Sequence, residues 1–291
     1  MFNERNKLER GLFFLDGKDW YEMRKKMNPM FLKNSGLAQA GMHSQRITDD
    51  TIHYLKSIAM ESQEPILVDL EKLLHEWSVK STLAAIYGES LTKSVDLNKF
   101  VGYVHEMFDS SAILQTKSAE LEATSNSPDW QTFSNAAFSS FEYLNQNFRS
   151  LPKNDGLAKL LRDTFNEEEV VRIVNDLIIA AADTTSYTTL WTLYLLATHP
   201  NHQEKALDVR AIMKESMRLF PVAPFLTRIQ QEPFEIGGYV IEAGQLVLIS
   251  TYAMGRDEVY FPEPNKCKFH AIKFSSFFDD LTVNRKPFKC V

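Results

Sequence analysis

A long stretch without glycine or proline is the feature that most limits what this chain can fold into. Within it, the helix signal starts at Asn166 and is not interrupted until His199-Pro200. Asn166 is a good helix cap, and Glu169 follows three residues later, as in a capping box. We therefore expect one helix from about 167 to 198, roughly 48 Å long at 1.5 Å per residue, which crosses a whole domain.

The middle of this expected helix carries small side chains next to an acid and hydroxyls. The alanines at 180–182 precede Asp183, Thr184 and Thr185. Small side chains let a flat group approach the helix backbone, and a threonine hydroxyl can bond to the carbonyl one turn back. A buried Asp183 must be paired or must serve chemistry. Two interpretations stay open: tight packing at the alanines with Asp183 paired to a basic residue, or a catalytic site.

Helices are also expected on both sides of this segment. Asp69 is a plausible N-cap, and Gly88 a plausible stop, for an apolar helix between them. Amphipathic helices are expected at about 133–148 and 208–219. The polar segment 115–128 is predicted to be a loop.

Strand signals follow the last of these helices. Gly237-Gly238 lies between short apolar runs and is a two-residue hairpin signal. The run Leu246–Ile249 predicts a short buried strand, and regular signals fade after Pro262. The predicted fold class is therefore mainly α with a small β portion.

Composition argues against several classes of function. The net charge of -6, without a basic stripe, argues against a nucleic-acid partner. Cys267 and Cys290 cannot make a disulfide framework, and no paired-cysteine zinc motif occurs. GxSxG, HExxH and P-loop motifs are absent, the histidines are scattered, and no metal site is predicted from them. Asp183 argues against a membrane span in the long apolar helix, because an acid at the bilayer centre costs roughly 2.5–3.5 kcal/mol.

Two residue pairs have the spacing of neighbours on one helix face. Trp20 and Arg24 are four residues apart, and an arginine beside an aromatic ring suits a carboxylate on a flat apolar molecule. Glu215 and Arg218 are three residues apart and can form an ion pair. Alone, each pair is also consistent with an ordinary surface contact.

Together and in this order, these segments resemble the cytochrome P450 family. The WxxxR motif (20–24) lies in that family's third large helix, the box at 180–185 in its long central helix, and the ExxR motif (215–218) in a later helix. A strand pair and a segment of the form of Thr251–Lys266 follow. The resemblance covers about Gly11 to Lys266 and implies the mainly helical P450 fold, incomplete in this chain.

The resemblance implies a heme b cofactor. Trp20, Arg24 and Arg228 match positions that contact the heme propionates. Ala181 lies among the small residues that a flat heme can approach. The implied reaction inserts one oxygen atom from dioxygen into a lipophilic small molecule such as a steroid.

The same resemblance assigns two roles near the heme. Asp183 and Thr184 match the acid–alcohol pair that delivers protons to dioxygen, because the distal oxygen atom must leave as water. Glu215 and Arg218 match a buried charge network that holds the fold near the heme.

The mitochondrial branch of the family resembles this chain best. Arg210 and Lys214 resemble the basic pair with which that branch binds its electron donor, a small acidic ferredoxin. The alternatives are two ordinary solvated cations, and the branch of the endoplasmic reticulum with its reductase. The family associates with membranes, and the branch implies the mitochondrial inner membrane, or alternatively the endoplasmic reticulum membrane. The charged start of the chain predicts no targeting segment or anchor.

Three departures from the family pattern are expected. The chain begins just before WxxxR, without the family's first helices and strands. The stretch between Pro200 and Glu215 is shorter than in the family and suggests an internal deletion. The resemblance stops after Lys266, which predicts a partial P450 domain at 1–266 and a divergent tail at 267–291.

The missing heme-ligand loop is the departure with the largest consequence. A thiolate ligand needs backbone N–H donors from a glycine-rich loop. Cys290 has no glycine before it, and Cys267 stands where an aromatic residue is expected. The arginine that completes the Glu215–Arg218 network is also missing. Whether the chain is an enzyme stays open. It is predicted to be a P450-type monooxygenase by family, in a truncated form without heme ligation. The alternative is a non-catalytic fragment or splice form that binds a redox partner or is unstable.

Overall fold

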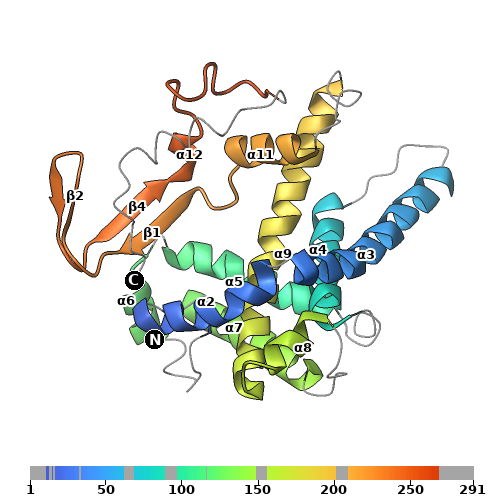
Figure 1. The fold of residues 1–291 in the computed structure, drawn as a ribbon, viewed down its shortest axis with the longest axis horizontal. Coiled ribbons are helices and arrows are strands. Elements are labelled where there is room, and N and C mark those ends of the chain that lie inside the picture. Colours follow the sequence, from blue (N-terminus) through green and yellow to red (C-terminus); the bar gives the residue numbers. More distant parts are fainter. Residues whose placement is uncertain are drawn as a thin grey trace. The chain divides into compact units, whose positions relative to one another are not determined.

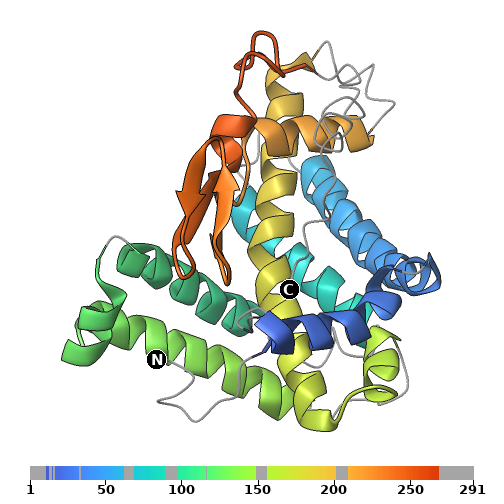
Figure 2. The same cartoon turned by 60° about the vertical axis from the view of Figure 1, so that its left-hand side comes forward.

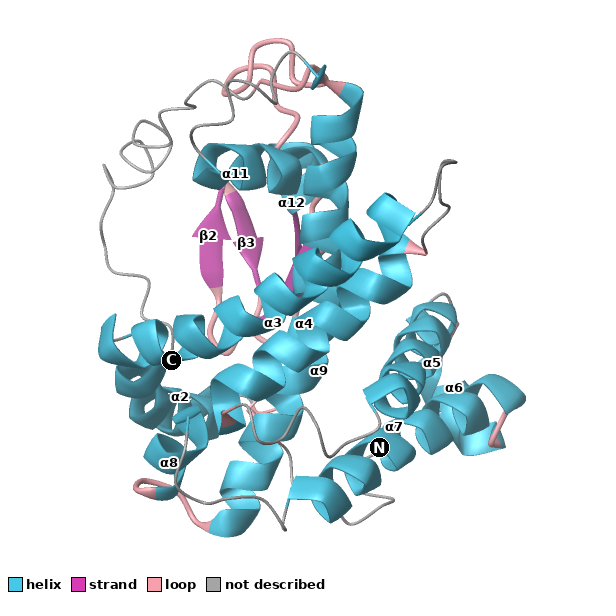
Figure 3. Cartoon of the chain, turned by 90° about the vertical axis from the view of Figure 1, so that its right-hand side faces the viewer, coloured by secondary structure: helices cyan, strands magenta, loops and turns pink. Residues whose placement is uncertain are grey.

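The computed structural model describes most of the chain and divides it into two compact units between Ser186 and Tyr187. The described residues are 11–12, 15, 17–32, 34–61, 69–88, 97–115, 117–148, 156–200 and 209–268. Helices dominate this part of the chain and strands are few, as Figure 3 shows, which confirms the predicted fold class.

The first unit is built from helices (Figure 1). In chain order they are α2 (Gly17–Leu32), α3 (Asn34–Glu61), α4 (Leu70–Tyr87), α5 (Leu97–Gln115), α6 (Ala119–Ser125), α7 (Pro128–Phe148), α8 (Gly156–Arg162) and the first part of α9 (Glu167–Thr198). The green helices α5 and α7 lie side by side in Figure 2, and α3 packs along α4.

One apolar cluster forms the core of the first unit. Ile173, Val174 and Ile178 recur at helical spacing and therefore lie on one face of α9. All three side chains are fully buried. This face packs with apolar side chains of α2, α4, α5, α7 and α8, among them Met27, Val79, Leu83, Phe100, Val104, Leu144 and Leu161. The long helix is thereby held along the half that ends at the alanines.

The start of α9 confirms the predicted capping box. The Asn166 backbone N–H donates to Glu169 Oε2 at 2.9 Å, and the Glu169 backbone N–H donates to Asn166 Oδ1 at 2.9 Å. Two of the N–H groups that a helix start leaves without partners are satisfied in this way. The helix then runs to Thr198, as predicted.

The predicted ends of α4 are also confirmed. The Asp69 side chain accepts from the Lys72 backbone N–H at 3.1 Å. Gly88 ends the helix with a positive φ of 78°, a region that favours glycine. These caps set the register of α4, and therefore which of its side chains face the core.

The segment 115–128 contains a helix where a loop was predicted. Helix α6 occupies Ala119–Ser125 and ends at Asn126, whose backbone is left-handed. The polar composition concealed one buried alanine, Ala123, which packs with Leu114 and Trp130. This tertiary contact favours a helical turn that the local sequence did not indicate.

The second unit contains the rest of α9, helix α11 and two small antiparallel sheets. Helix α11 covers Val209–Leu219, and the one-turn helix α12 covers Thr251–Met254. Strand β1 (Phe225–Ile229) pairs with β4 (Leu246–Ser250). Strands β2 (Phe234–Ile236) and β3 (Tyr239–Ile241) form the predicted hairpin around Gly237 and Gly238, whose φ values of 58° and 81° suit glycine.

Two strand predictions need correction. The run Leu246–Ile249 is a strand, but it is not buried: Leu246 is 64% and Leu248 59% exposed. Its partner β1 was not predicted as a strand. Two paired strands leave both faces open to solvent unless another layer covers them, so an apolar run alone does not predict burial.

The apolar contacts of the second unit include an aromatic stack. The indole of Trp191 on α9 lies parallel to the ring of Phe220, with centroids 4.1 Å apart and an angle of 6° between the rings. Tyr194 meets both rings edge-on. No helix in the part of the chain that the structure describes combines the length and hydropathy needed to cross a bilayer.

Candidate functional site

The middle of α9 carries the acid, the hydroxyls and the small residues singled out in the sequence. Ala182 is buried, while Ala181 and Asp183 are half-buried. The Thr184 hydroxyl donates to the Ala180 carbonyl oxygen at 2.7 Å, one turn back along the helix. The Ser186 hydroxyl makes the same kind of bond to Ala182 O at 2.7 Å. The hydroxyls of Thr184 and Ser186 are thus bonded to backbone carbonyls along the segment that carries Asp183.

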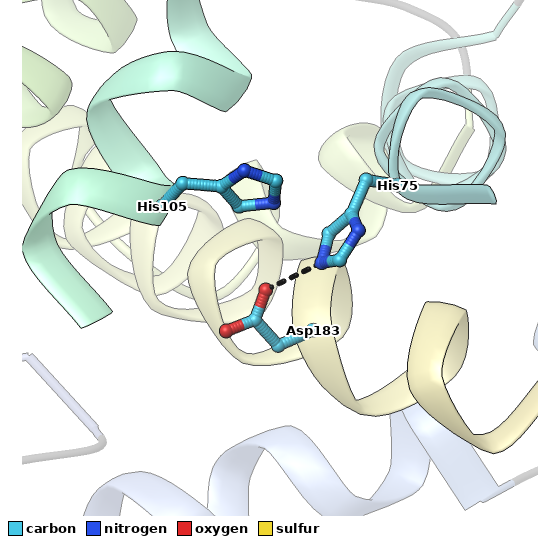
Figure 4. A group of neighbouring side chains, drawn as sticks. All are labelled: His75, His105 and Asp183. Carbon is cyan, nitrogen blue, oxygen red and sulfur yellow. Dashed lines mark hydrogen bonds and ion pairs between the residues drawn. The ribbon is translucent and has the colours of Figure 1, made fainter. Parts of the chain in front are cut away.

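Asp183 has a basic partner on another helix. His75 Nε2 of α4 lies 2.8 Å from Asp183 Oδ1 (Figure 4). His75 Nδ1 lies 3.1 Å from the Glu71 carbonyl oxygen, one turn earlier on α4. The pairing of Asp183 with a basic residue, one of the two interpretations left open, is therefore observed. It does not exclude the other interpretation, because a paired acid can still transfer protons.

The electrostatics of this pair favour a charged histidine. Burial lowers the pKa of His75, but the hydrogen bonds to Asp183 and Glu71 outweigh it and raise that pKa above its ordinary value. The Glu71 carbonyl can only accept, so His75 Nδ1 carries a hydrogen. The second nitrogen then faces a carboxylate oxygen, which requires a positive charge or a shared proton between them.

A second histidine completes this cluster. His105 on α5 meets the His75 ring edge-on, with centroids 4.2 Å apart and an interplanar angle of 87° (Figure 4). Burial and the neighbouring His75 lower the pKa of His105. His75 and His105 were not predicted as site residues, because they lie far from Asp183 in the sequence. The one available signal was that a buried aspartate on α9 requires a partner.

The backbone of α9 approaches α4 closely beside this cluster. The Ser78 hydroxyl donates to the Ala181 carbonyl oxygen at 2.8 Å, and Ser78 is fully buried. Ser78 is one turn after His75, so α4 contacts the same α9 segment twice. The side chain of Asp183 remains 17% exposed. The carboxylate therefore combines a fixed partner with access to solvent.

Trp20 and Arg24, predicted to contact heme propionates, lie one turn apart on α2 and are both half-buried. Helix α2 packs against α3 and α8. The α2 spacing places the indole and the guanidinium on one helix face, as the motif predicts. Their heme contact stays a prediction.

Glu215 and Arg218 form a buried ion pair in the second unit. Arg218 Nε and Nη2 each donate to one Glu215 carboxylate oxygen at 2.7 Å. The Arg218 side chain is 4% exposed and that of Glu215 is 1% exposed. The pair is thus bidentate and desolvated, unlike an ordinary surface contact.

Backbone groups complete the hydrogen bonding of this pair. Arg218 Nη1 donates to Gly255 O at 2.7 Å and to Pro264 O at 2.6 Å, and Nη2 donates to Lys266 O at 3.2 Å. The Lys268 backbone N–H donates to Glu215 Oε1 at 2.8 Å. The segment after α12 therefore wraps around the pair.

The remaining predicted cations lie on the surface of the second unit. Arg228 is exposed on β1, where its Nη1 donates to Thr227 O at 2.7 Å. Arg210 and Lys214 are exposed on α11, one turn apart. Their exposure is compatible with contact to a partner, and their roles stay predictions.

Of the two cysteines, the structure describes only Cys267, and Cys290 lies outside the described residues. Cys267 is half-buried and has no disulfide. Burial and the Glu215 carboxylate raise the pKa of its thiol to about 11. The surroundings of Cys267 therefore oppose a thiolate.

An open groove of about 570 Å³ lies along α5 and α7. Its lining includes Tyr103, Glu106 and Asp109. The described residues that were predicted to contact heme or transfer protons do not line it. The groove is therefore separate from the α9 segment.

Comparison with protein families gives a match over almost the whole chain. A family model described as "Cytochrome P450" matches residues 2–208 and 209–276. The two segments meet beside the point where the sequence suggests an internal deletion. The second segment extends past Lys266.

Curated relatives carry names of the same kind. They include "Cytochrome P450 315a1, mitochondrial" of Drosophila melanogaster, 28% identical over 91% of this chain and 58% of the relative. "Cytochrome P450 11B2, mitochondrial" of Rattus norvegicus is 26% identical over 89% of this chain and 58% of the relative. "Cholesterol side-chain cleavage enzyme, mitochondrial" of Oncorhynchus mykiss is 28% identical over 88% and 58%. The chain thus spans about three fifths of the length of these relatives.

A solved structure shares the fold. A six-coordinated cytochrome P450 from Thermus thermophilus superposes with a TM-score of 0.67 at 19% identity. The superposition covers 94% of this chain and 67% of the other.

Proposed function

Because the chain belongs to the cytochrome P450 family, we propose that its α9 segment is the proton-delivering side of a heme-dependent monooxygenase site. The observation that carries this proposal is the arrangement at the middle of α9. Small alanines precede Asp183 and Thr184, and the carboxylate is bonded to a histidine while it stays partly open to solvent.

Asp183 is the residue that holds the transferable proton in this proposal. Its Oδ1 lies 2.8 Å from His75 Nε2, so a proton from His75 can pass to the carboxylate without rearrangement. Thr184 is the next residue of α9 after Asp183. Its hydrogen bond to Ala180 O fixes the direction of the hydroxyl group. A hydroxyl oxygen can accept hydrogen bonds while it donates one, so Thr184 can hold in place a water molecule that carries the proton.

The chemistry of the predicted residues suits a heme in each unit taken by itself. In the first unit, Trp20 and Arg24 share a face of α2, where a guanidinium beside an indole suits a carboxylate such as a propionate. Ala181 has a side chain small enough for a flat group to approach. In the second unit, Arg228 is an exposed guanidinium with the same affinity for a carboxylate. Heme, when bound, would supply the iron at which dioxygen is activated, and the resemblance to the family assigns the propionate contacts to Trp20, Arg24 and Arg228.

The described cysteine does not fit the axial ligand. A low-pKa thiol in an electropositive environment is the form that binds metals, whereas burial and Glu215 raise the pKa of Cys267 to about 11. We therefore include in the proposal that Cys267 does not ligate heme iron. The same observation favours the second candidate, a non-catalytic P450 chain. Ligation by Cys290 is also not expected, on the sequence grounds given above.

The names of the relatives support further parts of the proposal: the class of substrate, the electron donor and the location. One relative is named for cholesterol side-chain cleavage, which supports a lipophilic, sterol-like substrate. The mitochondrial names support a mitochondrial location and a ferredoxin-type donor. Arg210 and Lys214 on α11 would meet the acidic face of that donor.

A reduced carbon-monoxide difference spectrum of the purified chain, supplemented with heme, tests the ligation. We expect no Soret band at the red-shifted position of thiolate-ligated heme. Cys267→Ser and Cys290→Ser variants serve as matched controls. A thiolate-type band that disappears in either variant would assign the ligand to that cysteine and overturn this part of the proposal.

Binding of a small acidic ferredoxin tests the partner face. The Arg210→Glu/Lys214→Glu chain should bind at least tenfold more weakly than the unmodified chain, with a smaller salt dependence, because two attractive charges become repulsive. Lys56→Glu, on the exposed side of α3, is the matched control. Equal loss in the control, or no loss in the double variant, would remove α11 as the docking helix.

A further inference from the structure

We propose that His75, His105 and Asp183 form a binding site for a divalent transition-metal ion, with zinc as the best match to this ligand set. The three side chains come from α4, α5 and α9 and point toward one another (Figure 4). Their nearest ligand atoms all lie within 4.8 Å of one another. The sequence does not bring these residues together in any recognisable metal motif.

The hydrogen bonds of His75 orient it as metal-bound histidines are oriented. His75 Nδ1 is bonded to the Glu71 carbonyl oxygen at 3.1 Å, and this bond fixes the ring with Nε2 toward Asp183. A backbone carbonyl on the far nitrogen is a common outer partner of a metal-bound histidine, because it sets the tautomer and the ring orientation. A cation at Nε2 can replace the proton that Nε2 otherwise shares with the carboxylate.

His105 supplies the second, independent observation. Its Nε2 is buried and has no hydrogen-bond partner among the residues that the structure describes. A buried nitrogen without a partner is costly, whereas a metal ion would satisfy it.

The ligand set favours zinc on geometry and charge. Two imidazoles and one carboxylate leave an open position for water, as in zinc sites with three protein ligands. Tetrahedral ligands at Zn–N and Zn–O distances of about 2.0–2.1 Å lie about 3.4 Å apart. The distance of 2.8 Å between Asp183 Oδ1 and His75 Nε2 must open slightly, and any separation between about 3.4 Å and the upper bound of 4.8 Å must close. Rotation of the His105 and Asp183 side chains provides such a movement.

Occupancy would have two consequences. It would join three helices of the first unit and stabilise the folded state by mass action. It would also occupy Asp183, which we propose as the proton-delivering acid, so the metal would inhibit; this second consequence rests on the proposed function, and the first does not.

Calorimetric titration of the whole chain with Zn²⁺, after chelator treatment, tests the site. A Cys267→Ser/Cys290→Ser background removes thiols as competing ligands. We expect one zinc ion per chain and a raised melting temperature. His105→Ala and Asp183→Asn should each weaken binding by on the order of tenfold or more. His53→Ala, which removes an exposed histidine of α3, should bind as tightly as the parent.

The metal-free melting temperature separates loss of a ligand from loss of folding. In chelator, His105→Ala should still unfold in one cooperative transition slightly below that of the parent, because the substitution removes the edge-on contact with His75 but no described hydrogen bond of Nε2. Unchanged zinc affinity in His105→Ala or Asp183→Asn would overturn the site, as would equal weakening in His53→Ala. The titration does not involve heme or substrate, so its failure leaves the proposed monooxygenase function standing.

Discussion

Replacing Arg218 with alanine should destabilise the second unit more than any surface substitution on α11. The guanidinium neutralises Glu215 through two bonds of 2.7 Å and holds the carbonyls of Gly255, Pro264 and Lys266. After truncation, those carbonyls lose their charged donor.

The magnitude follows from what Glu215 retains. Its side chain is 1% exposed, and its remaining donor among the described residues is the Lys268 backbone N–H at 2.8 Å. Removing one partner of a buried ion pair costs about 3–5 kcal/mol, because the other charge stays desolvated. That cost changes the ratio of folded to unfolded chain by about a thousandfold, and it is a large share of a typical stability of about 5–15 kcal/mol.

Urea unfolding, combined with hydrogen exchange of the backbone around 255–268, measures this effect. Arg218→Ala should lower the unfolding midpoint and speed exchange in that segment. Arg218→Lys keeps the charge without the planar fork, so it should lose less. Val209→Ala, at an exposed position of the same helix, should stay within about 0.5 kcal/mol of the parent. Exchange in 255–268 that is unchanged in Arg218→Ala would refute the wrapping of this segment around the pair.

Three further predictions concern single residues. Asn166→Ala should lower the free energy of unfolding in urea by about 1 kcal/mol, because the helix cap is lost. Asn166→Asp keeps a side-chain acceptor and should leave that free energy close to the parent's. In the Cys290→Ser chain, a thiol reagent at pH 8 should modify Cys267 slowly, because at a pKa of about 11 only about one thiol in a thousand is a thiolate. Unfolding the chain in urea should abolish this protection. In chelator, the raised pKa of His75 means that its bond to Asp183 stabilises the fold fully below the unfolded value of 6.5. The stability difference between parent and His75→Gln should therefore be larger at pH 6 than at pH 9; equal differences would contradict the charged pair.

Local signals predicted the elements whose ends are set by nearby residues. The caps of α4 and α9 depend on side chains within three residues of the backbone groups they bind, so the sequence alone predicts them. The hairpin at Gly237-Gly238 is equally local. Resemblance to known proteins predicted the family, because it uses the order of motifs along the chain.

Contacts between residues far apart in the sequence could not be predicted from such local signals. His75 and Asp183 are 108 positions apart, and nothing near either residue specifies the other. Burial of β4 was predicted wrongly because hydrophobicity describes a strand's preference, while exposure depends on what covers it. The backbone groups that complete the Glu215–Arg218 pair carry no side-chain signature at all.

The parallel stack of Trp191 on Phe220 gives the second unit an optical signature of its own. An indole held at a fixed angle against another ring produces near-ultraviolet circular dichroism, which vanishes when side-chain packing loosens even if helices persist. A Trp191→Phe chain would isolate that contribution by difference. The assembly of residues after Tyr187 can therefore be followed without a label, separately from the helices that surround His75.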